Sequence, residues 1–182
     1  ALSTLIDATR KPSPLFSDNP DPQFRTSETC NLDPSDPDVF AAEAALETLT
    51  GLDPVHGERL QGQRYETGQQ FKAHHDYLRP DLPYWERQEA VGGQRTWTAM
   101  VFLDRPEAGG ATYFPMFDLT IPPRAGTLVA WNNLTPAGEP NRATNHATYR
   151  APHAGLLTFI RRHRIEFFCG ASRRQQYELF PA

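Results

Sequence analysis

Two metal-ligand side chains stand two residues apart in the first half of the chain. His74 and Asp76 flank His75 in a segment whose residues favour a strand. Because side chains at i and i+2 on a strand point to the same side, His74 and Asp76 can bind one metal ion while His75 faces the other side. A third ligand must come from elsewhere, and His146 is the best candidate because it lies on a later predicted strand.

This ligand set suits a metal centre with open coordination positions. Two histidines and one carboxylate on one face of an octahedron leave three positions free, the arrangement associated with non-haem Fe(II) oxygenases. Zinc prefers tetrahedral coordination, and a zinc site could be built from the same ligands. A His-x-Asp pair also occurs by chance in many chains. The surrounding sequence therefore has to decide between iron, zinc and an ordinary strand histidine.

The segment ahead of these ligands is rich in turns. Six of the 17 prolines lie before residue 40, which argues against a helical bundle because each proline removes a backbone donor and fixes φ. One helix is predicted over residues 38–50, with Asp36 or Asp38 as its N-cap and Gly51 as its end. Such a helix can cover one face of a sheet.

From residue 63 onward, short runs of β-branched and aromatic residues alternate with Gly and Pro. The predicted strands are 63–65, 71–76, 95–103, 111–114, 118–121, 127–132, 145–149, 156–161 and 164–168. Many short strands without alternating helices indicate an antiparallel sandwich or jelly roll. We expect a single domain, with a loop and helix region over 1–62, a jelly-roll core over 63–168 and a tail over 169–182.

Composition excludes several other classes of protein. The 182 residues carry 18 Lys+Arg against 22 Asp+Glu, and this net charge of −4 argues against sequence-independent nucleic-acid binding. No run approaches the roughly 18 apolar residues of a membrane span, and the first ten residues lack the pattern of a signal peptide. Cys30 and Cys169 have no Cys-x-x-Cys spacing, so we expect reduced thiols. We expect a soluble cytoplasmic protein with neither nucleic acid nor membrane as a partner.

Five separated motifs resemble the prolyl 4-hydroxylase family of Fe(II)/2-oxoglutarate dioxygenases. They occur in the family's order, at about its spacings, and together cover roughly residues 25–150. The motifs are Tyr65-x-x-Gly68-Gln69-x-Phe71-x-x-His74-x-Asp76-Tyr77, then Gly92-Gly93-Gln94-Arg95, then Phe102-Leu103 followed by residues 109–115, then residues 123–132, and finally His146.

The resemblance implies a mainly β fold, a double-stranded β-helix (jelly roll) packed against N-terminal helices. It also implies a reaction like that of a procollagen-proline 4-dioxygenase, with Fe(II), 2-oxoglutarate and O2, and it allows for ascorbate. The substrate would be a protein or peptide that contains proline. Free amino acids and small metabolites stay open as alternatives.

Residue roles follow from the same resemblance. His74, Asp76 and His146 match the catalytic metal triad, and Tyr65 and Thr112 match residues that contact 2-oxoglutarate. Three further residues fall on the substrate side. They are Arg95, which matches an arginine, Phe71, which replaces a tyrosine, and Trp85, which lies in a loop that closes over substrate in related enzymes.

The match fails after His146. In the family, a Lys or Arg about ten residues beyond this histidine pairs with the distal carboxylate of 2-oxoglutarate, but Leu156 and Leu157 stand there. A nearby arginine can take over, and we expect Arg161 to do so, with Arg150 and Arg162 as alternatives. Because Arg161 is an odd number of residues from Leu156, this role requires a bulge.

The lack of a cation at Leu156 is open to two further interpretations. The tail after His146 can have diverged with loss of activity, or the given tail can differ from the natural one. The competing function is therefore a non-catalytic jelly-roll module that binds metal or peptide. A nucleic-acid dealkylase is a third candidate, which the net charge opposes. The basic cluster of residues 161–174 is expected to form a solvated strand edge.

Overall fold

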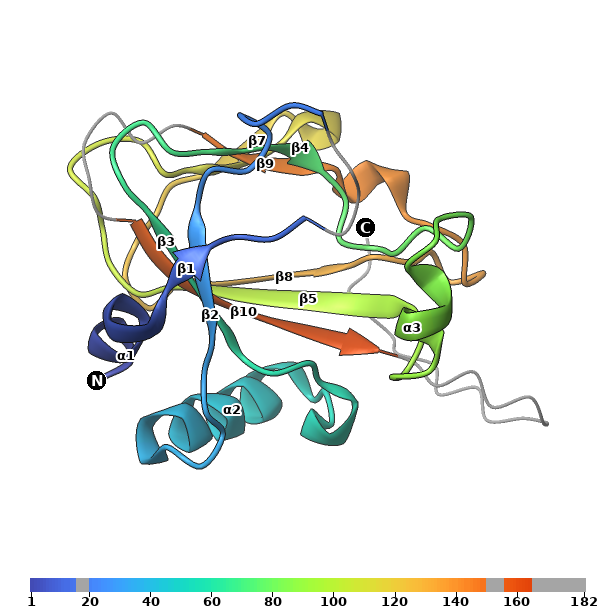
Figure 1. Cartoon of the computed structure of the whole chain (residues 1–182), viewed down its shortest axis with the longest axis horizontal. Coiled ribbons are helices and arrows are strands. Elements are labelled where there is room, and N and C mark those ends of the chain that lie inside the picture. The colour runs from blue at the N-terminus through green and yellow to red at the C-terminus, as the bar shows by residue number, and fades with distance from the viewer. Residues whose placement is uncertain (16–19, 150–155, 165–182) are drawn as a thin grey trace.

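The computed structural model describes residues 1–15, 20–149 and 156–164, and two antiparallel sheets face each other in it (Figure 1). The six-stranded sheet has the order β1-β2-β3-β10-β5-β8, and the four-stranded sheet has the order β4-β9-β6-β7. The strands of the large sheet are β1 (Lys11–Pro12), β2 (Glu28–Asn31), β3 (Gln61–Tyr65), β10 (Leu156–Arg164), β5 (Arg95–Phe102) and β8 (Leu128–Asn132). Those of the small sheet are β4 (Phe71–His74), β9 (His146–Thr148), β6 (Thr112–Phe114) and β7 (Leu119–Ile121).

The helices of the described chain are few. They are α1 (Leu2–Thr9), α2 (Pro37–Thr50), α3 (Trp85–Glu89) and the 3-10 turns η1 (Pro54–His56), η2 (Pro115–Phe117) and η3 (Arg142–Thr144). Helix α2 confirms the predicted helix, because the Asp36 side chain accepts a hydrogen bond from the Asp38 N–H and Gly51 ends the helix at φ 69°. In Figure 1, α1 and α2 lie against the face of the large sheet that points away from the small sheet.

The N-terminal region holds more structure than the sequence indicates. Helix α1 and strands β1 and β2 lie in the part expected to be loop around one helix. Each is short, and β2 is stabilised by pairing with β3 rather than by its own residues. Because this pairing joins segments that are distant in sequence, the local residue pattern of the turn-rich segment does not indicate these elements.

Strand β10 differs from its prediction. The sequence predicts two strands, over 156–161 and 164–168, but Leu156–Arg164 is one continuous strand, and residues 165–168 lie outside the described chain. It pairs with β3 on one side and β5 on the other, so it is central. The expected solvated basic edge is therefore wrong for Arg161, Arg162 and His163, which are all buried.

Two apolar clusters cover the two faces of the large sheet. Strand β10 alternates between them, with Leu157 and Phe159 on the helix side and Leu156 and Ile160 in the space between the sheets. The helix-side cluster comprises Ile6, Cys30, Leu32, Val39, Leu46, Leu60, Ala99, Leu157 and Phe159. The cluster between the sheets comprises Tyr65, Phe71, Met100, Phe102, Phe114, Trp131, Leu156 and Ile160.

The structure bears on two further expectations, those for the cysteines and for membrane-spanning segments. Cys30 is buried and reduced, whereas Cys169 lies outside the described residues. Among the helices of the described chain, none combines the length and the apolar character needed to cross a membrane.

Candidate metal centre and the pocket around it

The three expected metal ligands come together at one end of the space between the sheets. His74 and His146 are opposite each other on the paired strands β4 and β9, with ring centroids 4.3 Å apart. Asp76 lies two residues beyond the end of β4. One ligand atom of each of the three residues lies within 4.8 Å of the others, which suits a single metal ion. His75 points elsewhere, with its Nε2 3.2 Å from the carbonyl oxygen of Arg142.

Both histidine rings are oriented by main-chain carbonyls. Nδ1 of His74 lies 2.8 Å from the Lys72 oxygen, and Nδ1 of His146 lies 2.9 Å from the Thr144 oxygen. Because a carbonyl only accepts hydrogen bonds, Nδ1 carries the hydrogen and Nε2 keeps its lone pair for a metal. Burial lowers the pKa of both rings, so they are neutral at neutral pH, the form that binds metal.

Asp76 is held as an anion by two donors. The Thr98 hydroxyl donates to its Oδ2 at 2.8 Å, and Nε of Arg162 donates to its Oδ1 at 3.1 Å. Asn133 in turn donates to the Thr98 hydroxyl at 2.9 Å. Burial is the largest single influence and would raise the pKa of Asp76, but the surrounding basic groups, with Arg162 foremost, together outweigh it and hold that pKa well below its usual range. The carboxylate is therefore ready to bind a cation.

A second acidic residue, Glu58, organises the arginines beside the triad. Nε and Nη2 of Arg95 donate to its carboxylate at 2.6 and 2.8 Å, and Nε of Arg164 donates at 2.8 Å. Nη1 of Arg95 also reaches the Asp76 carbonyl at 3.5 Å. Arg95, expected on the substrate side, thus lies within contact of a metal ligand.

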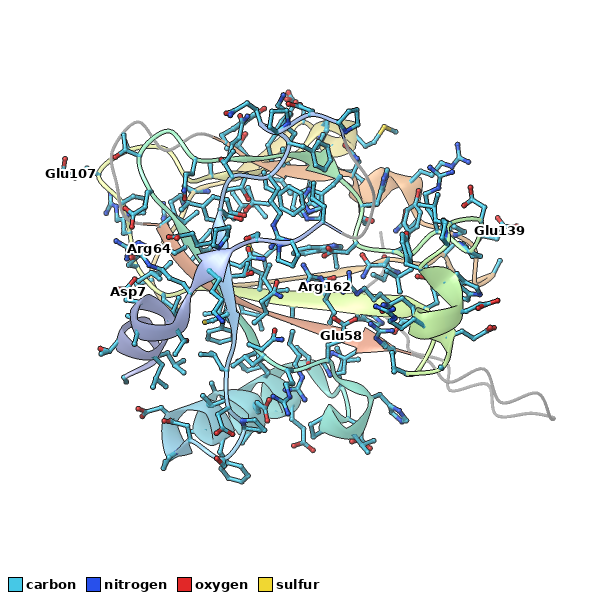
Figure 2. The ribbon with its side chains drawn as sticks, in the orientation of Figure 1. Asp7, Glu58, Arg64, Glu107, Glu139 and Arg162 are labelled. Carbon is cyan, nitrogen blue, oxygen red and sulfur yellow. The ribbon has the colours of Figure 1, made fainter. Side chains whose placement is uncertain are left out.

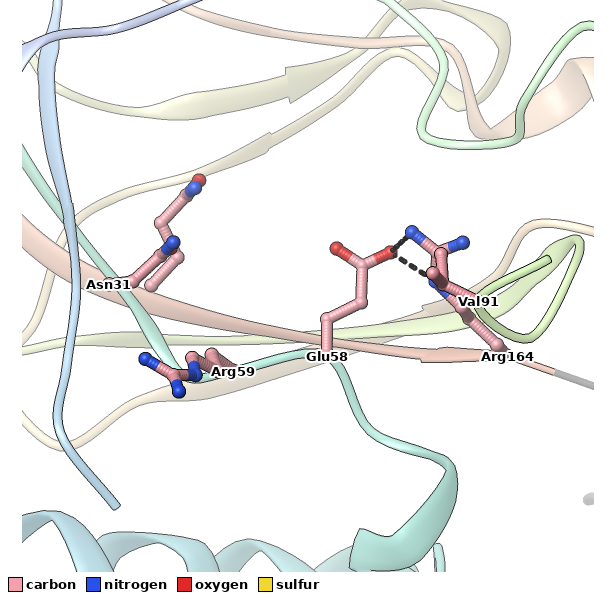
Figure 3. Close-up of a pocket in the computed structure, with 6 residues that line it drawn as sticks. Asn31, Glu58, Arg59, Val91 and Arg164 are labelled. Carbon is pink, nitrogen blue, oxygen red and sulfur yellow. Dashed lines mark hydrogen bonds and ion pairs between the residues drawn. The ribbon is translucent and has the colours of Figure 1, made fainter. Parts of the chain in front are cut away.

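Glu58 and Arg164 also line a hollow of about 300 Å³ (Figure 3). Its other lining residues are Asn31, Arg59, Gln61 and Val91. Figure 2 shows Arg162 in the space between the two sheets, with Glu58 nearby. Two arginines and one glutamate thus line this hollow, and Glu58 is connected through Arg95 to the main chain of Asp76.

Aromatic rings and hydroxyls surround the histidines. Phe71 stacks on the His74 ring at 3.5 Å between centroids, and Trp131 lies 4.7 Å from the His146 ring. Tyr65 and Thr112 are buried in the same space, as their expected contact with 2-oxoglutarate requires. Burial raises the pKa of Tyr65, so its hydroxyl is a neutral donor.

Several polar atoms around this space have no partner within the described chain. They are the Thr112 and Thr158 hydroxyls, Nε1 of Trp131 and Nη2 of Arg25, all buried. Buried polar groups in folded proteins are nearly always hydrogen-bonded, so a cluster of unpaired ones indicates a polar ligand. The residues present therefore fit a metal ion together with a small anionic molecule.

The expected role of Arg161 is corrected by the structure. Its guanidinium bonds to Glu43 of α2 and, at 3.0 Å, to the carbonyl oxygen of Pro54, on the helix side of the sheet. The only register shift in its pairing with β5 falls between His163 and Arg164, too late to turn Arg161 inward. Leu156, in contrast, faces the pocket and offers no charge.

The other residues predicted for the site lie in different places. Arg162 faces the site at Asp76, Trp85 begins α3 and is partly buried, and Arg150 lies outside the described residues. Sequence reasoning missed three site residues, which are Arg25, Glu58 and Thr98. Thr98 had a usable signal, as a polar residue on the inward face of a strand that continues with Met100 and Phe102. Arg25 belongs to the segment Arg25-Thr26-Ser27, which resembles one ahead of the family's helix but carried no predicted role.

Comparison with known proteins supports the resemblance to Fe(II)/2-oxoglutarate dioxygenases. The family model described as the 2OG-Fe(II) oxygenase superfamily matches residues 60–168. The chain is 36% identical over 127 residues to rat prolyl 4-hydroxylase subunit alpha-1, which covers 69% of the chain and 23% of the rat protein. It is 33% identical over 129 residues to human prolyl 4-hydroxylase subunit alpha-3, with coverages of 69% and 23%. The chain thus spans about a quarter of the length of these curated relatives.

Solved structures share the fold. A viral collagen prolyl hydroxylase from Paramecium bursaria Chlorella virus-1, captured with 2-oxoglutarate, matches with a TM-score of 0.64 at 24% identity, over 79% of this chain and 81% of that one. A prolyl hydroxylase from Trichoplax adhaerens, in complex with a hypoxia inducible factor peptide, matches with a TM-score of 0.66 at 13% identity, over 91% and 74%. The expected mainly β jelly roll is confirmed.

Proposed function

Because the chain belongs to the 2OG-Fe(II) oxygenase superfamily, we propose that it hydroxylates prolyl residues of a protein or peptide, using Fe(II), 2-oxoglutarate and O2. The observation that carries the proposal is the convergence of His74, Asp76 and His146 within 4.8 Å. The carbonyl partners leave Nε2 of both histidines free for a metal. Each Asp76 oxygen accepts one hydrogen bond and keeps a further lone pair for a metal. The prolyl 4-hydroxylase relatives supply the substrate class.

The residues around the site have three separate roles: metal binding, orientation of Asp76 and exclusion of water. His74, Asp76 and His146 would hold the iron, which together with 2-oxoglutarate and O2 supplies the oxidising chemistry. Thr98 and Arg162 hold the Asp76 carboxylate in place by their hydrogen bonds to its two oxygens. Phe71, Trp131 and Phe114 surround the histidine rings and exclude water from them.

The substrate side is supported by the arginine cluster at Glu58. The Glu58 carboxylate fixes Arg95 beside Asp76, and the hollow next to it is open to a polar chain. A peptide presents main-chain carbonyl groups that arginines can bind. We therefore place the peptide along this hollow, with Arg95 as a positioning residue.

One observation favours the alternative function. Leu156 occupies the position at which the resemblance requires a cation, and it is 1% exposed. A module that binds metal or peptide without catalysis would need no such cation. The triad and the buried hydroxyls of Tyr65 and Thr112 favour the enzyme.

The decisive experiment is an anaerobic titration of metal-free protein with Fe(II) and then with 2-oxoglutarate. A visible charge-transfer band that saturates, and that is lost in His146→Ala, establishes the iron site and a working cosubstrate site. Succinate formation and a mass increase of one oxygen in a prolyl peptide then establish the reaction. Iron binding without the charge-transfer band favours the alternative function, a non-catalytic module that binds metal or peptide.

A further inference from the structure

The question left by the proposed function, on which this inference rests, is what neutralises the distal carboxylate of 2-oxoglutarate. Leu156 packs among Tyr65, Phe71 and Phe102, and it lies opposite Tyr65 in the strand pairing. A carboxylate buried there without a cation would lose a charge-assisted hydrogen bond and leave its charge unpaired. A cation must therefore come from another element.

Four arginines near the site are already committed. Arg95 and Arg164 are both bound by Glu58, and Arg162 is bound to Asp76 at the metal end of the pocket. Arg161 faces the helices. Each of these guanidinium groups would have to give up a charged partner to reach a second anion.

Arg25, in the segment just ahead of β2, is different. Its Nη1 donates to the Pro14 carbonyl at 3.2 Å and its Nε to the Ser27 hydroxyl at 3.3 Å, two neutral partners. Its Nη2 is buried and has no hydrogen-bond partner within the described chain. Burial lowers the pKa of Arg25 to about 10, so the side chain is still charged at neutral pH.

The position of Arg25 brings this unpaired atom to the pocket. Its guanidinium carbon lies 4.6 Å from the centre of the Phe71 ring, and the two residues form a backbone bridge. Ser27, to which Arg25 donates, interacts with the Tyr65 hydroxyl, as does Thr148. Among the carboxylates of the described chain, the one whose charge acts on Arg25 is the metal ligand Asp76.

The small sheet supplies the other side of the same space. Phe71 is paired with Thr148, and Thr148 is paired with Thr112, so these three side chains lie in a row on one face across β4, β9 and β6. Thr112 carries an unpaired buried hydroxyl. Two unpaired donors, Nη2 of Arg25 and the Thr112 hydroxyl, therefore border one buried region. The Tyr65 hydroxyl lies beside them and at present donates a long bond of 3.3 Å to Oε1 of Gln63, which it can exchange for a ligand.

We propose that Arg25 binds the distal carboxylate of 2-oxoglutarate through its free Nη2, and so replaces the cation that Leu156 lacks. The Tyr65 and Thr112 hydroxyls complete the set of donors. The anchor thus comes from the N-terminal segment instead of the last strand. The same site predicts a preference for 2-oxo acids that carry a second carboxylate.

The test measures binding rather than turnover. Iron-loaded protein is titrated anaerobically with 2-oxoglutarate, and separately with 2-oxobutanoate, which lacks the distal carboxylate, and the charge-transfer band is followed. We expect Arg25→Ala to weaken 2-oxoglutarate binding about 10- to 100-fold, the loss of one charge-assisted hydrogen bond. The weaker binding of 2-oxobutanoate should change less than about twofold.

Matched variants keep the result unambiguous. Arg25→Lys retains the charge and should lose only a few-fold in affinity, and Arg124→Ala, an exposed arginine between β7 and β8, should behave like the unaltered protein. Leu156→Lys, added to Arg25→Ala, returns a cation to the pocket from β10 and should restore most of the 2-oxoglutarate affinity. Far-ultraviolet circular dichroism of each variant confirms that it is folded.

The outcomes separate this inference from the proposed function. No band in the unaltered protein overturns the proposed function. A normal band with unchanged 2-oxoglutarate affinity in Arg25→Ala overturns the assignment of Arg25 alone. Equal weakening of 2-oxoglutarate and 2-oxobutanoate also overturns it, because Arg25 would then not act on the distal carboxylate.

Discussion

Nε of Arg162 lies 3.1 Å from Oδ1 of Asp76, and the two side chains are only 8% and 3% exposed. A metal ligand is therefore paired with a buried cation from the central strand β10. Because a bound metal ion brings its own positive charge to Asp76, the importance of this pair for stability depends on whether metal is present.

Arg162→Met should destabilise the metal-free protein by about 3–5 kcal/mol, the usual cost of leaving one member of a buried ion pair alone. With Mn(II) bound as a redox-inert substitute, the ion stabilises the Asp76 charge, and the loss should fall by at least half. Urea unfolding with and without Mn(II) measures both values. Arg161→Met is the control, since its partner Glu43 lies on the helix side and its cost should not depend on metal. Equal losses for Arg162→Met in both states would contradict the prediction.

Glu58→Gln should loosen the arginine cluster. The carboxylate pairs with both Arg95 and Arg164, and although burial alone would raise the pKa of Glu58, these arginines lower it, so it is charged at neutral pH. Its neutralisation removes the carboxylate that the two guanidinium groups share, at a cost of roughly 3 kcal/mol. Denaturant unfolding measures this cost, with the exposed Glu47→Gln as control. A change below about 1 kcal/mol would show that solvent already screens the cluster.

Gly62→Ala should destabilise the junction of α1 with β3. A Cβ at residue 62 would lie 2.3 Å from Cγ1 of Ile6, which is fully buried, so the helix must shift. Overpacking of this kind costs about 1–3 kcal/mol. In a double-mutant cycle with Ile6→Ala, the cost of Gly62→Ala should largely disappear, because the clashing methylene group is gone. Additive effects of the two changes would argue against this contact.

His163 should make stability fall in mild acid. Burial, with a further contribution from the Arg161 charge, lowers the pKa of His163 to about 4 from its ordinary 6.5. Between these two pH values only the unfolded chain takes up the proton, so the free energy of unfolding decreases as the pH falls from 6.5 to 4, by up to about 3 kcal/mol. His163→Gln removes this part of the decrease.

The comparison of the two unfolding profiles isolates His163. His74 and His146 also have lowered pKa values and contribute in the same direction in both proteins. The charged groups that act on His163 are Arg161, His56, Asp53 and Glu58, and all of them are retained in the variant. Parallel profiles from pH 6.5 to 4 would mean that the ring is solvated in the folded protein.

Local patterns account for what the sequence predicted well. The spacing of His74 and Asp76, the caps Asp36 and Gly51 around α2, and the alternation within β5 all depend on neighbours a few residues away. His146 was found because family motifs precede it in order. These features are fixed by the chemistry of short segments, so a sequence read alone can find them.

The choice between Arg161 and Arg162 could not be predicted from the sequence. Adjacent residues on a strand face opposite sides, and a one-residue difference in register exchanges them. The pairing of β10 with both β3 and β5 settled the question, with Arg161 at the helices and Arg162 at Asp76. Nothing within residues 156–164 encodes that register, because it depends on strands roughly 60 to 100 residues earlier in the chain.

The amino-acid sequence by itself determined the metal ligands, the mainly β architecture and the absence of a charge at Leu156. Only the tertiary structure decided that Glu58 gathers Arg95 and Arg164, and that Arg25 brings an unpaired donor to the pocket from about 50 residues before the ligand strand. The physical reason is that ligand type is a property of a side chain. The partner of a buried charge, in contrast, is set by which distant segments pack together around it.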